Sequence, residues 1–592
     1  ISLTPVDAIP DLSENQVLVY ADWTGRSPQE VEDQVTYPLT TGLQGLAGVK
    51  EVRATSMFGF SLATLIFDDK IDTYFARARV LERLNFLQAS MPQGVTVQLG
   101  PDASSLGWIY QYYLHVDPAK IKDGGYDLAQ LRSLQDWYIR YQLASVQGVA
   151  EVASIGGFVK QYQIELSSNK MRASNITLMD VITAVQNSNL NVGGKTIEEN
   201  GAEFVLRGIG LVSRTEDLEL VTVKAKEGTP IYLKDIATIQ IGGDFRRGAL
   251  DLNGHEAVGG TVVMRTGENA KEVIRHVKEK INEIANSLPP GVTIRSFYDR
   301  SDLIDRTIDT LKHALLEEII LVTLAHVVFL WHFRSILIVT LPLPVSILIS
   351  FLLMQQFGIT SNIMSLTGIA IAIGVLVDAA IVVTENVIRH CEKAENEMRR
   401  PLTRAETWHT TLTASKQVGR PIFFAMAIII LAFVPVFALT GQEGKLFHPL
   451  AFTKTFAMIG STLLAVTLVP VLCSLFVRGP FHAEDRNIVM KLLLRLYEPT
   501  RNWALNHRKT IMGTAMLILA GAILTAFGLP RAAVKGIRDA GHPQLAAMVS
   551  GFGREFMPPL NEGSLLYMPV MMPKTGFREI QRVMSWQDKV IA

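Results

Sequence analysis

The chain has 592 residues, of which 48% are hydrophobic and 19% charged, and its 56 basic side chains balance 56 acidic ones. That length exceeds one domain, and the balanced charge, with no basic stripe between aromatic residues, argues against nucleic acid as a partner. Its two cysteines, Cys391 and Cys473, offer no disulfide framework. Residues 1–300 have the composition of a soluble protein, whereas 308–530 hold most of the long apolar runs.

The first hundred residues predict a β-α-β-β-α-β unit, the split ferredoxin-like arrangement. A capping box at Ser27, with Pro28 as the first helical residue, starts the first helix. Apolar alternation predicts the strands. In chain order the elements are a strand at 16–23, a helix at 27–43, strands at 51–55 and 62–67, a helix at 72–88 and a strand at 95–99.

A second unit of the same kind is predicted to be interrupted. It begins with a strand at 107–115, a helix at 128–146 and strands near 151–154 and 161–167. It is completed by a strand at 258–265, a helix at 271–287 and a strand at 292–298. The intervening residues, with short strands at 231–233 and 237–241, predict a small inserted module that serves as a docking surface or is merely decorative.

Six apolar spans follow, each long enough to cross a bilayer as a helix. They lie at 311–333, 336–355, 363–384, 422–439, 450–477 and 511–529. The connections at 386–420 and 478–509 are rich in Lys and Arg, which places them in the cytoplasm and residues 1–300 on the other side. This topology requires a further span before Ile1 or an N-terminus exported by other means, and we favour the further span.

An internal repeat agrees with that prediction. The sequence P-D-L-S-E at 10–14 resembles P-P-L-N-E at 558–562, which closely follows the last span. Parallel duplication of this kind is common in transporters. The repeat therefore predicts that a span also preceded Pro10 and that the chain stops early in a second copy.

Asp378 stands inside the span at 363–384, and its nearest charged neighbour in sequence is Glu385. A carboxylate at that depth costs roughly 2.5–3.5 kcal/mol on insertion scales, so it indicates a function by default. Proton or ion coupling is one interpretation, and a structural ion pair with a neighbouring helix is the other. Gly368 and Gly374, with several alanines, predict a small-residue surface for close helix packing.

Several longer motifs resemble the resistance-nodulation-division (RND) family of efflux pumps, and within it the heavy-metal branch with its copper and silver exporters. Besides the Asp378 span, they are P-D-L-S at 10–13, Q-V-T-Y-P-L-T-T at 34–41, G-P-D-A at 100–103, L-R-S-L-Q-D-W at 131–137, Y-D-R-S at 298–301, G-Q-E-G at 441–444 and L-A-F-T-K-T at 450–455. The resemblance implies a homotrimer in a bacterial inner membrane, working with a periplasmic adaptor protein and an outer-membrane channel.

The resemblance also implies the fold, an α-helical membrane bundle joined to an α+β periplasmic domain. Its parts would be a first porter subdomain at 1–100, a split second one at 101–155 and 247–303, a docking subdomain at 156–246, the membrane helices at 308–530 and the start of a third porter subdomain at 555–592. The stretch at 531–554 is longer than the usual link of the family at this point and is left without an account.

Asp378 matches the proton-relay aspartate of the family. No His/Cys cluster has zinc spacing, but thioether sulfur suits Cu(I) and Ag(I). Met568 matches one ligand of a three-methionine site in the copper pumps, and Met364 and Met458 match a methionine relay, although methionine also fills apolar cores. Leu376 and Phe245 stand where those exporters carry methionine, which questions a complete relay.

The sequence thus predicts a proton-driven exporter of heavy-metal cations, most specifically Cu(I) or Ag(I), that needs no resident cofactor. The rivals are a pump for divalent metals or organic compounds, and a scaffold or fragment that does not transport. An enzyme is disfavoured, because no nucleophile–base arrangement or phosphate-binding loop stands in residues 1–300.

Overall fold

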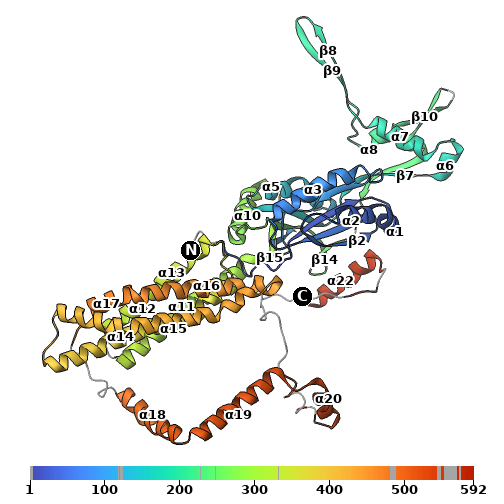
Figure 1. Cartoon of the computed structure of the whole chain (residues 1–592). Coiled ribbons are helices and arrows are strands. Elements are labelled where there is room, and N and C mark those ends of the chain that lie inside the picture. Colours follow the sequence, from blue (N-terminus) through green and yellow to red (C-terminus); the bar gives the residue numbers. More distant parts are fainter. Residues whose placement is uncertain are drawn as a thin grey trace. The chain divides into compact units, whose positions relative to one another are not determined.

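The computed structural model describes residues 5–117, 119, 125–226, 228–246, 248–330, 333–479, 488–542, 544, 549–551, 570–572 and 575–591. Its elements are labelled along the chain in Figure 1. The chain divides into two compact units. One comprises Ile1–Leu12 with Ser301–Met568, and the other Ser13–Arg300 with Pro569–Ala592.

The first sheet of the second unit has the predicted β-α-β-β-α-β order. Its strands are β1 (Gln16–Asp22), β2 (Val49–Met57), β3 (Phe60–Phe67) and β4 (Thr96–Leu99), in the order β2-β3-β1-β4. The helices are α1 (Pro28–Val31) and α2 (Tyr37–Leu43), joined by a π turn, and α3 (Thr73–Gln88). The capping box predicted at Ser27 is present. Alternate residues of β1 are buried, so its apolar face forms the core with the helices.

The second sheet repeats this topology with an insertion. Its order is β6-β14-β5-β15, and β13 pairs with the outer part of β14. The strands are β5 (Trp108–Val116), β6 (Val149–Gly156), β13 (Leu250–Leu252), β14 (His255–Met264) and β15 (Val292–Asp299). The helices are α4 (Leu128–Leu134), α5 (Arg140–Ala144) and α10 (Ala270–Ile284).

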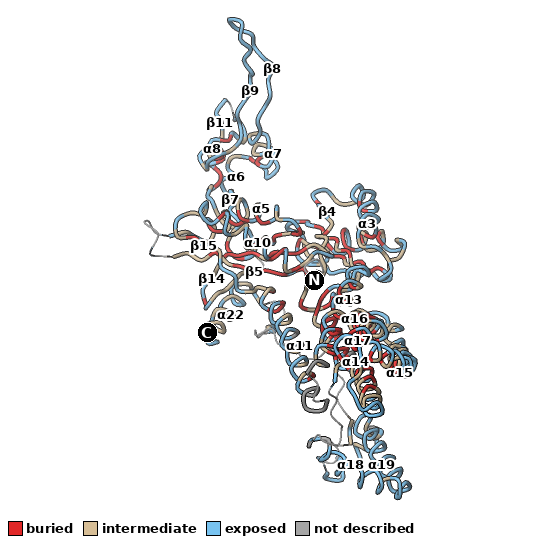
Figure 2. The backbone as a smooth tube through the Cα atoms, turned by 90° about the vertical axis from the view of Figure 1, so that its left-hand side faces the viewer, coloured by how far each residue is buried: buried red, intermediate tan, exposed pale blue. Residues whose placement is uncertain are grey.

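The strand at 161–167, which the apolar alternation assigned to the second unit, belongs to the insert, within the range 156–246 that the resemblance implied for the docking subdomain. It forms β7 (Lys160–Leu166) and pairs with β12 (Ala237–Gly243), not with the second sheet. The sequence could not assign it, because the alternation that predicts a strand does not name its partner. The rest of the insert consists of α6 (Ser168–Ala173), α7 (Leu178–Ser188), β8 (Val192–Glu199), β9 (Ala202–Gly208), α8 (Thr215–Glu219), β10 (Thr222–Lys226), β11 (Thr229–Tyr232) and α9 (Leu233–Ile236). Figure 2 shows the β8–β9 hairpin exposed along its whole length.

The helical unit contains five helices in the described ranges that are long and apolar enough to cross a membrane. They run over Ile336–Gln356, Ile363–Met398, Arg404–Ala438, Gly441–Val466 and Arg508–Phe527. The predicted span at 311–333 falls on α11 (Arg300–Leu330) and continues into 331 and 332, which lie outside the described residues. That span therefore stays a prediction.

Two expectations about this unit need correction. The connection predicted at 386–420 is mostly helix, because α14 (Ile363–Met398) and α15 (Arg404–Ala432) extend beyond their apolar parts and leave only a short turn. The span predicted at 450–477 is two helices, α16 (Gly441–Val466) and α17 (Leu468–Phe476). Pro470 has no N–H to donate to Val466, and the helix breaks between them at Thr467.

The remaining helices of this unit are α12 (Phe333–Thr340), α13 (Pro342–Gln356), α18 (Ile488–Asn506), α19 (Arg508–Phe527) and α20 (Arg531–Asp539). A last helix, α22 (Phe577–Ile591), belongs to the other unit and packs against β13.

Candidate functional site

Helix α14 carries Asp378, and its first turn is firmly fixed. Asn362 is the N-cap, and its side-chain oxygen accepts hydrogen bonds of 3.0 Å from the N–H groups of Met364 and Ser365. Ser361 forms a β-bridge with Val6, so the segment before the first sheet is bound to the start of this helix. Capping and bridging together fix where α14 begins.

One face of α14 is buried against α16. Thr453 Oγ1 on α16 donates a 2.8 Å hydrogen bond to the carbonyl of Ser365. A Cβ atom built at Gly368 would lie 2.3 Å from that hydroxyl and 2.5 Å from the carbonyl of Leu450. Only glycine fits there, which confirms the close helix packing that the sequence predicted at this position.

Another side of α14 is open, and it carries Asp378. The exposed residues follow one another at helical spacing: Ile371 is 47% exposed, Gly374 and Asp378 are exposed, and Val382 is 43% exposed. A Cβ built at Gly374 would meet nothing within 4 Å. The sequence predicted a buried acid at Asp378. In the structure this residue is exposed, and it forms no ion pair with any other described residue.

Of the three candidate metal-binding methionines, two lie among the described residues, and both are buried. Met364, in the first turn of α14, is 8% exposed, and Met458 on α16 is 1% exposed within the apolar cluster of the helical unit. Met568 lies outside the described residues. Across the part of the chain that is described, no group of three or more His, Cys, Asp and Glu side chains could hold a metal.

Sequence reasoning overlooked a buried cation on α16. Lys454 is 6% exposed, and its ammonium lies 3.5 Å from the centre of the Phe433 ring. Within the described ranges the ammonium forms no ion pair with a carboxylate. Its cation–π contact with the Phe433 ring is therefore the interaction that stabilises the charge. It stands one helical turn before Met458. The signal was present in the sequence, because a lysine within an apolar span is rare.

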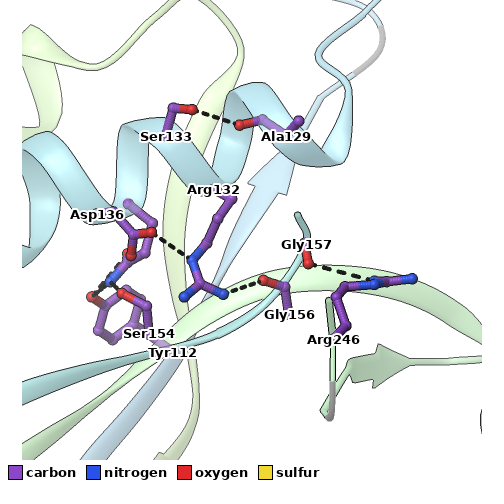
Figure 3. Close-up of polar contacts among 10 residues, drawn as sticks. Tyr112, Ala129, Arg132, Ser133, Asp136, Ser154, Gly156, Gly157 and Arg246 are labelled. Atoms are coloured by element: carbon purple, nitrogen blue, oxygen red, sulfur yellow. Dashed lines mark hydrogen bonds and ion pairs between the residues drawn. The ribbon is translucent and has the colours of Figure 1, made fainter. Parts of the chain in front are cut away.

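A cavity of about 210 Å³ lies where the insert joins the second sheet. It is lined by Arg132, Ser154, Ile155, Gly156, Gly157, Val159, Asp244, Phe245, Arg246 and Gly248. Figure 3 shows Arg132 between Asp136 and the carbonyl of Gly156, at 2.7 and 2.8 Å. Next to it, Tyr112, Gln135 and Ser154 form a hydrogen-bonded group. Burial raises the pKa of the Tyr112 hydroxyl, so it stays a neutral donor and acceptor.

Arg246 joins three segments of this unit at the edge of the cavity. Its guanidinium lies 3.7 Å from the centre of the Phe158 ring and 5.3 Å from that of Phe577 on α22. It forms an ion pair with Glu256, which also accepts a 2.7 Å hydrogen bond from Gln581 on α22. The insert, β14 and α22 therefore share one partly buried polar contact.

Comparisons with known proteins show which family this chain resembles in sequence and in structure. Residues 1–539 match the model of the AcrB/AcrD/AcrF family. The chain is 44% identical over 591 residues to the cation efflux system protein CusA of Escherichia coli K12. The matched region covers 99% of this chain and 54% of that protein. It is 42% identical to the putative cation efflux system protein SilA of Salmonella typhimurium, with 99% and 54% covered.

Its structure is similar to a crystal structure of a heavy metal efflux pump, with a TM-score of 0.75, 32% identity, and 89% of this chain and 49% of that one covered. The chain thus spans about half the length of the curated relatives it matches. It belongs to the AcrB/AcrD/AcrF family, the RND transporters, and within it to the heavy-metal efflux branch.

Proposed function

We propose that this chain works in a proton-driven exporter of heavy-metal cations, most specifically Cu(I) or Ag(I), in a bacterial inner membrane with residues 1–300 on the periplasmic side. The observation that carries the proposal is Asp378 on the uncovered face of a membrane-spanning helix. A carboxylate facing lipid is costly. We infer that another helix of the assembled exporter covers this face.

Asp378 can take up a proton there and lose its charge. In a low-dielectric contact the neutral acid and the carboxylate differ strongly in free energy, so proton uptake favours one packing of the helices over another. Gly374, one turn earlier on the same face, leaves room for a close approach. The packing of α14 against α16 at Gly368 gives that movement a rigid support.

The metal assignment rests on ligand chemistry and on the resemblance of the motifs. Met364 and Met458 are uncharged soft donors in the membrane unit, and Met568 would add a third thioether. Their burial is equally what core packing requires. Divalent metals are the second candidate, because the cobalt-zinc-cadmium resistance protein CzcA of Cupriavidus metallidurans is 37% identical to this chain. The scaffold that does not transport would show no metal effect.

The test is Asp378→Asn in the expressed exporter, compared with Glu385→Gln on the same helix. Glu385 is a half-exposed carboxylate two turns after Asp378, beyond the predicted apolar span at 363–384, and it pairs with Arg389 at 3.2 Å, so its substitution removes the same charge from the same side of the helix but outside that span. We expect D378N to abolish silver and copper resistance in cells lacking other exporters, and E385Q to retain it. Membrane insertion should be equal in both. Undiminished resistance in D378N would refute the coupling role.

We further propose the homotrimer, with a periplasmic adaptor protein and an outer-membrane channel. The β8–β9 hairpin supports self-association, because Ile197, Phe204 and Val205 are 51%, 57% and 75% exposed. Exposed apolar residues of this kind mark interaction surfaces. Phe204→Ser with Val205→Ser should lower the trimer fraction in cross-linking. An unchanged oligomeric state would separate the hairpin from assembly.

A further inference from the structure

The segment after α19 leaves the membrane helix and returns to the same point. The N–H of Leu529 donates a 2.8 Å hydrogen bond to the carbonyl of Val549. A Cβ built at Gly528 would lie 2.5 Å from the backbone of Ser550, so the two ends of the excursion touch. The excursion between Leu529 and Val549 therefore begins and ends at the same end of α19. This is the stretch for which the sequence provided no account.

The excursion is held close to the bilayer surface by its attachment. Helix α19 has 20 residues and the composition of a membrane span, and none of its apolar window is buried in the chain. At 1.5 Å per residue it is about 30 Å long, which matches the hydrocarbon core. Only three residues separate Phe527 from the start of α20 at Arg531. A chain of that length reaches about 10–14 Å, so the start of α20 stays within that distance of the end of α19.

Helix α20 presents charge on one side and apolar residues on another. Lys535 and Arg538 are exposed and stand three residues apart, the spacing of a single helix face. Val534 and Ile537 share a different face and are only partly covered. With Asp539 as the one acid, the helix has three basic residues and one acidic one, a net charge of +2.

We propose that α20 lies on the membrane and binds anionic phospholipid headgroups. Phosphate groups complement the basic face, while Val534 and Ile537 enter the boundary of the acyl chains. This is how basic amphipathic helices bind membranes. The proposal requires α19 to cross a bilayer and does not depend on metal export or on Asp378.

The test is the depth of a spin label on α20 in lipid nanodiscs. The chain would carry V534C, with Cys391 and Cys473 replaced by alanine, in phosphatidylcholine alone or with phosphatidylglycerol added. We expect the label to be reached by lipid-dissolved oxygen when phosphatidylglycerol is present. A label at A532C, on the other side of the helix, should stay accessible to a water-soluble nickel chelate.

Removing basic side chains from α20 tests whether anionic headgroups hold this helix on the membrane. Each basic residue near an anionic surface favours binding about fivefold, so Lys535→Gln with Arg538→Gln should lower the ratio of docked to detached helix roughly thirty-fold. The matched control, Lys491→Gln with Arg495→Gln on α18, removes the same charge before α19 and should change nothing. If the V534C label stays water-accessible in both lipids, or if the α20 charges have no effect, the proposal is wrong.

Discussion

Replacing Gly368 by alanine should destabilise the membrane unit, and the same change at Gly374 should not. The added Cβ at Gly368 would lie 2.3 Å from Thr453 Oγ1 and 2.5 Å from the carbonyl of Leu450. The second contact is backbone, so the helices must separate. Overpacking of this kind costs about 1–3 kcal/mol. At Gly374 the new methyl group meets nothing within 4 Å.

Gly368→Ala and Gly374→Ala are the same chemical change in the same helix, so they differ only in the packing around the added methyl group. Both gain the helix propensity of alanine over glycine, about 1 kcal/mol, so the difference between them isolates the packing. We expect G374A to be more stable than G368A by about 1–3 kcal/mol, measured by thermal unfolding of the detergent-solubilised chain. Equal stability would show that the close contact of α14 with α16 does not hold these helices together.

Three further predictions concern charged groups. Arg246→Met leaves its partner carboxylate partly buried with only the hydrogen bond from Gln581 and should cost about 1–3 kcal/mol in thermal unfolding; no loss would show that this contact does not join the insert to α22. In the insert, hydrogen bonds from Thr177 and Ser213 lower the pKa of Asp180 and Asp217. Because the folded pKa lies below the unfolded value of about 3.9, the stabilisation is complete above that value and is lost as pH falls through the folded pKa. The protection factors of the α7 and α8 amides should therefore fall at acid pH, and unchanged protection in this window would contradict the linkage. Lys454→Met removes an ammonium that costs about 2.5–3.5 kcal/mol at the centre of a span, so insertion of α16 should improve in a glycosylation reporter; poorer insertion would mean that the charge is paired in the membrane.

The sequence predicted much of the local structure correctly, because the signals are local. Strand alternation predicted β1 and β3, and the capping box at Ser27 marked the helix between them. It also identified the apolar part of α14 and Asp378 within it. The strand at 161–167 was predicted, but its pairing with β12 was not, because that pairing depends on residues more than 70 positions away.

The two glycines of α14 show what the sequence alone could not decide. Both are small residues in one apolar span, and the same rule predicted close packing at both. The tertiary structure buries Gly368 against α16 and leaves Gly374 on the open face with Asp378. Composition determined that this helix belongs in a membrane, because transfer from water depends on the side chains alone. Which side meets another helix was decided by packing, because that depends on where the neighbouring helices lie.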